Sequence, residues 1–277
     1  MTKPAGAADA LPWRVEDLDF ATLDPALTRA DETLFFLLVS ASFIETGADV
    51  YTGNLLAYYR DDAETSAWLS AHWEQEELQH GRALKTYVRR VWPEFDWETA
   101  FARFFEHYRT TCTGEQLEPT PALELAARCV VETGTATYYR MLLSYAREPV
   151  LRQMLDHIRS DEVRHFKHFY RYFRRHQQVA GHGRLHIARV LWHRLREAMN
   201  EDGYIAFHHA YAQRYPDRPN TAATYAAFRQ RISRIARAHY PYSMGAEMLL
   251  TPLALPAPVR RHGVKAVGHA FRLAGFR

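Results

Sequence analysis

The chain has 277 residues, 47% hydrophobic and 24% charged, so it is long enough to bury a sizeable core. Its net charge of +3 is small, and no nucleic-acid-binding motif accompanies it, so we expect no nucleic-acid partner. The two cysteines, Cys112 and Cys129, do not make a disulfide framework. This cysteine usage, and first residues without the apolar core of a signal peptide, predict a cytoplasmic protein.

The chain divides into three predicted parts. An extended N-terminal arm, 1–23, precedes a bundle of long helices, 24–180, and a helical extension with a basic tail, 181–277, follows. Proline, glycine and capping residues set the expected boundaries. The helices of the bundle are expected at 24–59, 61–91, 96–108, 120–146 and 148–178, and those of the extension at 184–200, 203–214, 220–239 and 259–275. Since no strand pattern and no apolar run of membrane-spanning length is seen, we predict an all-α protein without a transmembrane segment.

Capping residues define the first two long helices. Asp24 followed by Pro25 is typical of a helix start, with the aspartate as N-cap. The Asp61-x-x-Glu64 pattern resembles a capping box and predicts the start of the second helix. Four of the expected helices are roughly 25–35 residues long, well above the usual length of about 11–12 residues. Long helices joined by short loops predict an antiparallel bundle.

Two Glu-x-x-His motifs fall on the second and fourth of these long helices. They are Glu77-x-x-His80 and Glu162-x-x-His165. Residues three apart share one face of a helix, so each motif directs a carboxylate and an imidazole to the same point. With 19 Glu and 15 His in the chain, about one such match arises by chance, so the motifs gain weight only from their arrangement.

Glu45 on the first long helix and Glu132 on the third complete a repeated order, a lone Glu followed by Glu-x-x-His. Burying even one unpaired carboxylate costs several kcal/mol, and two divalent cations would cancel the charge of four. Oxygen and imidazole ligands suit iron or manganese. The alternative is that these acids lie on solvated faces. Asp161 and Glu76, each just before a ligand glutamate, either accept the free ring N–H of a ligand histidine or are surface charges.

At this point the sequence resembles the ferritin-like diiron carboxylate superfamily. The residues that carry the resemblance are Glu45, Glu77, His80, Glu132, Glu162 and His165. Within that superfamily, Trp73-x-x-Glu76-Glu77-x-x-His80-Gly81 and Asp161-Glu162-x-Arg164-His165 are most similar to the two histidine motifs of soluble acyl-acyl-carrier-protein desaturases. The resemblance covers about residues 30–178. After about residue 180 we see no similarity.

The resemblance implies a ferritin-like four-helix bundle, and the helices expected after residue 180 are additional to it. It further implies roles for three residues. Thr135, three positions after the third ligand, would help to deliver protons during oxygen activation. Asp161 and Trp13 would lie on a path that feeds electrons to the metals. Trp73, one turn before Glu77, is either redox-active or an ordinary core aromatic.

The function expected from this resemblance is an O2-dependent diiron oxidase or oxygenase that acts on an apolar, acyl-type substrate. Its cofactor would be two iron ions, or one manganese and one iron, with O2 as co-substrate. Electrons would come from an external donor such as a ferredoxin, and acyl carrier protein is a candidate partner. We expect a monomer or homodimer. Three alternatives stay open: a ferritin-like iron-storing protein, an N-oxygenase or other oxygenase of a small metabolite, and a metal-bound protein without turnover.

The end of the chain is basic. Glu247 is the last acidic residue, and five Lys and Arg follow it. Such a tail could dock an acidic protein or an anionic lipid surface, or it is simply a solubilising end.

Overall fold

The computed structural model describes residues 11–114, 117–198 and 202–274, and the regular structure in these ranges is entirely helical. The prediction of an all-α chain is therefore confirmed for the described residues. The helices are α1 (Glu32–Thr46), α2 (Ala48–Tyr58), α3 (Ala63–Trp68), α4 (Glu74–Val91), α5 (Trp97–Thr111), α6 (Pro121–Tyr145), α7 (Pro149–Ala180), α8 (Arg184–Ala198), α9 (Asp202–Arg214), α10 (Ala222–His239), α11 (Tyr242–Leu250) and α12 (Ala257–Ala274).

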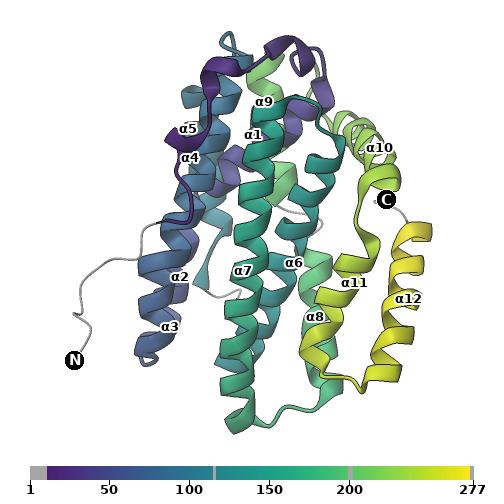
Figure 1. The fold of residues 1–277 in the computed structure, drawn as a ribbon. Coiled ribbons are helices and arrows are strands. Elements are labelled where there is room, and N and C mark those ends of the chain that lie inside the picture. The colour runs from purple at the N-terminus through teal and green to yellow at the C-terminus, as the bar shows by residue number, and fades with distance from the viewer. Residues whose placement is uncertain (1–10, 115–116, 199–201, 275–277) are drawn as a thin grey trace.

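Two antiparallel helix pairs form the centre of the molecule (Figure 1). In one pair α1 packs against α4, and in the other α6 packs against α7 along most of its length. The second pair is joined by a short turn at residues 146–148, so its two helices run in opposite directions. The large buried cluster contains apolar side chains from all four helices.

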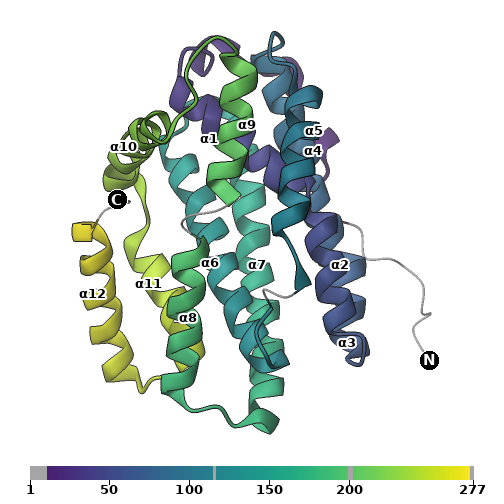
Figure 2. The same ribbon diagram turned by 180° about the vertical axis from the view of Figure 1, so that it is seen from behind.

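The extension after α7 packs on this centre and hides much of it. Helix α9 lies against α1 and α5, while α8, α10 and α11 each contact α6. Helix α12 lies on the outside against α11 (Figure 2). The extension therefore completes the core on the far side of α6 and α1.

The first long helix starts later than the sequence pattern predicts. The Asp24 side chain accepts a hydrogen bond from the backbone N–H of Ala26 and opens only a short 3-10 turn, Pro25–Leu27. The cap of α1 is Asp31, which accepts from the backbone N–H of Leu34. The predicted helix 24–59 is also wrong in being continuous, because it breaks at Gly47, and glycine disfavours the interior of a helix.

The second long helix differs from its prediction in two respects. Its N-cap is Asp62, which accepts from the backbone N–H of Thr65, so the proposed capping box at Asp61 is wrong. A π-helical segment, Leu69–Trp73, interrupts the α-helix between α3 and α4. Such segments are rare and often occur at functional sites, and this one ends one turn before Glu77.

Other boundaries follow the predicted caps. Asp96, Thr120 and Glu148 cap α5, α6 and α7, and Gly181 ends α7 in the left-handed region with a φ of 63°. Helix α11 was not predicted, although Pro241 precedes it. The arm is not fully extended, because its described part contains two 3-10 turns, Val15–Asp17 and Phe20–Thr22. The predicted positions 1–10, 115–116, 199–200 and 275 lie outside the described residues.

By length and composition, the segment Glu32–Tyr58 is apolar enough to cross a membrane. Within the fold, 67% of its most apolar window is buried against other helices. Its hydropathy is thus accounted for by its place in the core between α4 and α9.

A close approach between α1 and α4 makes Gly81 essential for packing. A Cβ at this position would lie 2.8 Å from the backbone nitrogen of Thr46 and 2.9 Å from its Cα. We therefore expect Gly81→Ala to destabilise the protein by about 1–3 kcal/mol, through overpacking. Gly53→Ala on α2, where a Cβ would have no atom of the described residues within 4 Å, is the matched control and should be neutral or stabilising by up to about 1 kcal/mol. Urea unfolding of both variants would measure this, and equal effects would contradict the close approach.

Candidate metal centre

The six predicted ligand side chains lie together in the interior between the two helix pairs. They are Glu45 on α1, Glu77 and His80 on α4, Glu132 on α6, and Glu162 and His165 on α7. All six are buried, so the alternative of solvated faces is wrong for this set. The arrangement brings four carboxylates and two imidazoles into one dry space.

Their ligand atoms form two groups that share two residues. Glu45, Glu77, His80 and Glu162 make one group, in which one ligand atom from each residue lies within 4.8 Å of the others. The second group replaces Glu45 and His80 with Glu132 and His165, and it meets the same criterion. Glu77 and Glu162 belong to both groups. The structure therefore contains two adjacent groups of side chains that could each hold a metal ion, with two carboxylates in common.

The spacing of these atoms fits metal ligands. Donors about 2.1 Å from one ion lie about 3.0 Å apart when adjacent and about 4.2 Å apart when opposite. In the first group, His80 Nδ1 lies 3.3 Å from Glu162 Oε1, 3.5 Å from Glu77 Oε2 and 3.8 Å from Glu45 Oε2. In the second, His165 Nδ1 lies 3.1 Å from Glu77 Oε1, 3.6 Å from Glu132 Oε2 and 3.9 Å from Glu162 Oε2. All of these separations fall within or at the edge of that range.

The outer ring nitrogen of each histidine, Nε2, contacts a buried carboxylate from the other helix pair. His80 Nε2 lies 3.1 Å from Asp161 Oδ2, and His165 Nε2 lies 2.7 Å from Glu76 Oε2. An ionised carboxylate only accepts hydrogen bonds, so the proton of each ring is on Nε2. When the ring is neutral, the inner nitrogen, Nδ1, carries a lone pair that points at the ligand carboxylates, which is the orientation a metal-binding histidine needs.

Arg164 links these two outer carboxylates. Its Nη2 donates to Asp161 Oδ1 at 2.7 Å and to Glu76 Oε2 at 2.8 Å. Burial alone would raise the pKa of Asp161, but hydrogen bonds from His80 and Trp13, together with the charge of Arg164, lower it. The pKa of Glu76 is also lowered against the effect of burial, by His165 and Arg164. Both carboxylates therefore stay ionised and act as acceptors.

Four buried polar atoms facing the centre have no hydrogen-bond partner among the described residues. They are His80 Nδ1, His165 Nδ1, Glu132 Oε2 and Glu162 Oε1. Unsatisfied buried polar atoms are uncommon in folded proteins and each costs about 1–3 kcal/mol. Here two lone pairs of nitrogen and two carboxylate oxygens face one another. A cation between them removes this cost, so the donor set fits a metal pair.

Without metal, the cluster must hold protons instead. Burial and the neighbouring Glu162 and Glu45 carboxylates raise the pKa of Glu77 to about 7. Burial raises the pKa of Glu132 to about 8. Burial opposes protonation of His80, yet contacts with Asp161 and the ligand carboxylates raise its pKa well above the usual value. Metal ions would displace these protons, so metal binding and proton release are coupled.

The N-terminal arm reaches this centre through Trp13. The indole Nε1 donates to Asp161 Oδ2 at 2.7 Å, and Gln79 Nε2 donates to the backbone carbonyl of Trp13 at 2.8 Å. The ring stacks on His157 at 5.1 Å, and His157 is only partly buried. A continuous chain of contacts therefore runs from near the surface through Trp13 and Asp161 to His80.

The other two predicted residues also lie at the centre. The Thr135 hydroxyl donates to Glu162 Oε2 at 2.6 Å. Trp73 is buried, with its ring centroid 6.4 Å from that of His165 and the two rings at 69°, and its Nε1 has no hydrogen-bond partner within the part of the chain that the structure describes. Its position shows a core aromatic beside the site and does not by itself indicate a redox role.

Two residues at the centre were not among the predicted site residues. Arg164 stands inside the second motif, but its bridging of two carboxylates needs both helix pairs in place. The Tyr139 hydroxyl donates to Glu45. Tyr139 follows Thr135 by four residues and Glu132 by seven, so helical spacing already places it on the same face of α6.

No protein-family model matches this chain, and no curated protein matches it in sequence. The interpretation of the site therefore depends on its geometry and on the resemblance of its motifs.

The carboxylates that contact Nε2 of the two histidines are expected to affect metal affinity. We expect Asp161→Asn to weaken metal binding by about 10–100-fold, because the variant no longer fixes the His80 ring with a charged acceptor. Asp156→Asn, an exposed position on the same helix, is the matched control and should bind metal like the original protein. A competitive titration against a chelator measures both. Equal affinities for the two variants would mean that Asp161 does not orient a ligand.

Proposed function

We propose that this protein is an O2-dependent oxidase or oxygenase with a non-haem diiron centre, acting on an apolar, acyl-type substrate. The observation that carries the proposal is the pair of buried groups with shared Glu77 and Glu162 and with both Nδ1 lone pairs directed inward. Oxygen and imidazole donors favour iron, or a manganese–iron pair, over structural zinc.

The helix arrangement supports the same proposal. Each antiparallel pair contributes a lone glutamate and one Glu-x-x-His motif, as diiron carboxylate bundles do. We propose on this basis that α1, α4, α6 and α7 form a ferritin-like four-helix bundle, with the later helices added outside. The fold alone does not select the reaction, so the substrate class depends on the resemblance of the two motifs.

Two ferrous ions, when bound, would supply the electrons and the Lewis acidity needed for reduction of O2. The chain's own residues then have separate tasks. Thr135 Oγ1 lies 2.6 Å from Glu162 Oε2, and its hydroxyl proton can exchange with the interior of the site. The surrounding apolar cluster, which includes Trp73, Cys129 and Phe169, excludes water from the centre.

Electrons would enter from outside the chain. The contacts from His157 through Trp13 and Asp161 to His80 give a route between the protein surface and the site. We propose a soluble donor such as a ferredoxin that docks near the N-terminal arm. Acyl carrier protein is the proposed carrier of the substrate.

Oxygen consumption tests this function. The protein, loaded with Fe(II) without air, would be mixed with a reducing system and acyl substrates, and O2 uptake and product masses recorded. We expect O2 uptake that depends on substrate, with a product that has lost two hydrogens or gained one oxygen. Uptake of many iron ions per chain into a large cage, with no product, would instead identify iron storage and overturn the proposal.

A further inference from the structure

Basic charge is concentrated in two stretches of this chain. Residues 163–196 contain nine Lys and Arg, and residues 248–277 contain five, while neither stretch contains Asp or Glu. The two stretches hold fourteen of the 35 Lys and Arg and none of the 32 acids, so the rest of the chain is net negative by eleven charges. The small net charge therefore conceals a strong separation of positive and negative charge along the sequence.

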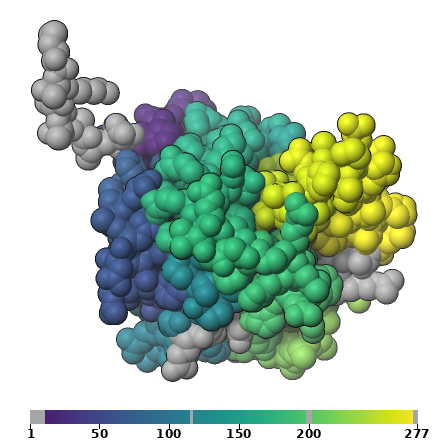
Figure 3. Space-filling view, turned by 90° about the horizontal axis from the view of Figure 1, so that it is seen from below, coloured from purple at the N-terminus to yellow at the C-terminus, as the bar shows by residue number. Residues whose placement is uncertain are grey.

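The fold brings parts of the two stretches together at one end of the molecule. The end of α7, the start of α8 and the 3-10 turn Thr251–Leu253 meet there, next to the start of α12 (Figure 1). Arg184 Nε donates to the carbonyl of Leu253 at 3.1 Å, and its Nη2 donates to that of Ala254 at 3.2 Å. Seen from below, the green residues of α7 and α8 lie beside the yellow C-terminal residues (Figure 3).

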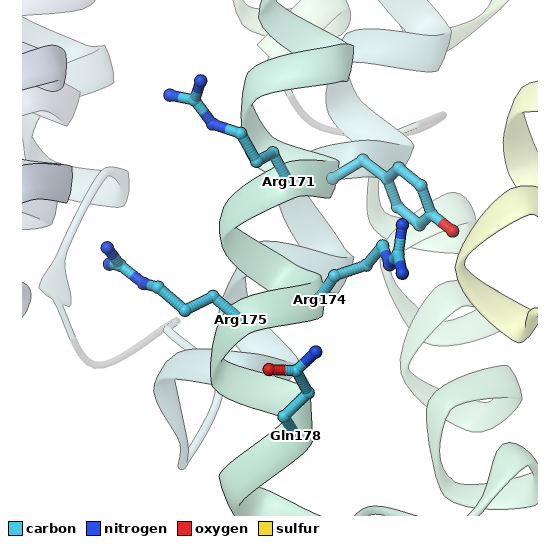
Figure 4. A pocket seen from close by; sticks show the side chains of 5 residues that line it. Arg171, Arg174, Arg175 and Gln178 are labelled. Carbon is cyan, nitrogen blue, oxygen red and sulfur yellow. The ribbon is translucent and has the colours of Figure 1, made fainter.

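A cleft of about 380 Å³ opens between these segments, and polar side chains line much of it. Its lining includes Arg174, Gln177, His182, Arg184 and Pro252. On α7, Arg171 and Arg175 extend to one side of the helix and Arg174 to the other (Figure 4).

These arginines differ in their partners. Arg175 is paired with Asp62 and Glu64, whereas Arg174 is exposed and has no ion-pair partner among the described residues. Arg174 is therefore available to an external anion.

Exposed apolar side chains lie on the same end. Val179 is 92% exposed, Leu185 68% and Trp192 61%. Helix α8 buries its other face, with Ile187 and Leu191, inside the molecule. Since Leu185, Arg189 and Trp192 are spaced by four and three residues, they share the outer face of α8. This face alternates apolar and basic side chains along the helix.

We propose that this end of the molecule, where α7 ends and α8 begins, binds the surface of an anionic lipid bilayer. We call it the basic end, defined by Arg174, Val179, Leu185, Arg189 and Trp192. Tryptophan and aliphatic side chains beside arginine are the composition of helices that lie in a bilayer interface. An acidic protein would satisfy the arginines, but Val179 and Leu185 would gain little from it. The proposal depends on charge and exposure at this end and not on the metal centre, so it can fail without affecting the proposed oxidase.

Vesicle co-sedimentation of the full chain tests it. We expect binding to vesicles of phosphatidylglycerol and phosphatidylcholine at about 0.1 M salt, little binding to phosphatidylcholine alone, and release at high salt. The absence of binding to the anionic vesicles, or equal binding to both kinds, would overturn the proposal. Capture of an acidic protein without vesicle binding would also overturn it.

Matched variants locate the surface. Arg174→Glu should weaken vesicle binding by more than about tenfold, since each basic residue near an anionic surface is worth about fivefold. Leu185→Asp should weaken it by a similar factor. Arg147→Glu and Leu27→Asp make the same changes at exposed positions near the start of α7 and before α1 and should bind like the original protein. Arg147 precedes Arg174 by 27 residues along α7, which places it about 40 Å away at a rise of about 1.5 Å per residue. If the two control variants lost as much vesicle binding as Arg174→Glu and Leu185→Asp, the proposal would be overturned.

Discussion

Glu77→Gln is expected to abolish binding of both metal ions at once. Glu77 is shared by the two ligand groups, so its loss removes a donor from each position. Glu45 belongs to one group only, and Glu45→Gln is therefore expected to leave about one ion per chain. Metal analysis after loading with Fe(II) and desalting would show about two ions in the original protein, about one in Glu45→Gln and almost none in Glu77→Gln.

Misfolding does not explain such a loss, because the same substitution should stabilise the metal-free protein. Burial raises the pKa of Glu77 to about 7, which means that its charged form is unfavourable in the metal-free fold. A neutral glutamine of the same shape removes that cost. Thermal unfolding of the metal-free variant should therefore occur at the same or a higher temperature. Two ions retained in Glu77→Gln would contradict the shared position of this residue.

The metal-free protein is expected to lose stability as pH rises from about 5 to 8. The pKa of Glu77 is raised to about 7 and that of Glu132 to about 8, mainly by burial, compared with a normal value of 4.5. A carboxyl group whose pKa is raised in the folded state makes its full contribution to the stability of the fold below about pH 4.5. This contribution disappears as the pH rises through the pKa of the folded state. His80 and His165 also have raised pKa values, and their contribution is likewise lost as pH rises.

The lowered pKa of Glu162 acts at more acidic pH and does not oppose this trend. Burial raises that pKa, but contacts with His165 and His80 outweigh burial, so its contribution is lost only below about pH 4.5. Urea unfolding of metal-free protein between pH 5.5 and 8 should show a decline of a few kcal/mol. Metal binding releases the protons, so the stabilisation by added metal should grow with pH. Stability of the metal-free protein that rises toward pH 8 would contradict this view of the cluster.

The sequence predicts the site better than it predicts the helices that carry it. Spacing of three residues on a helix is a local property, so Glu77 with His80 and Glu162 with His165 point together wherever the helix begins. Helix ends depend on which of several neighbouring acids forms the cap. Asp24 and Asp31 are both capable caps, and Asp61 and Asp62 are adjacent, so a pattern of residue types does not choose between them.

Features that join distant helices could not be found from spacing. The bridge from Arg164 to Glu76 and the contact from Trp13 to Asp161 connect residues 88 and 148 positions apart. The basic end likewise exists only because the turn at Leu253 folds against Arg184. In both cases the residue types were visible in the sequence, but the packing that brings them together was not.

Anomalous scattering from crystals of the protein loaded with Fe(II) tests the central claim most directly. Data at the iron absorption edge should show two peaks, one between Glu45, Glu77, His80 and Glu162 and the other between Glu77, Glu132, Glu162 and His165. A map without a peak among these side chains, or with iron only at the surface, would contradict the account.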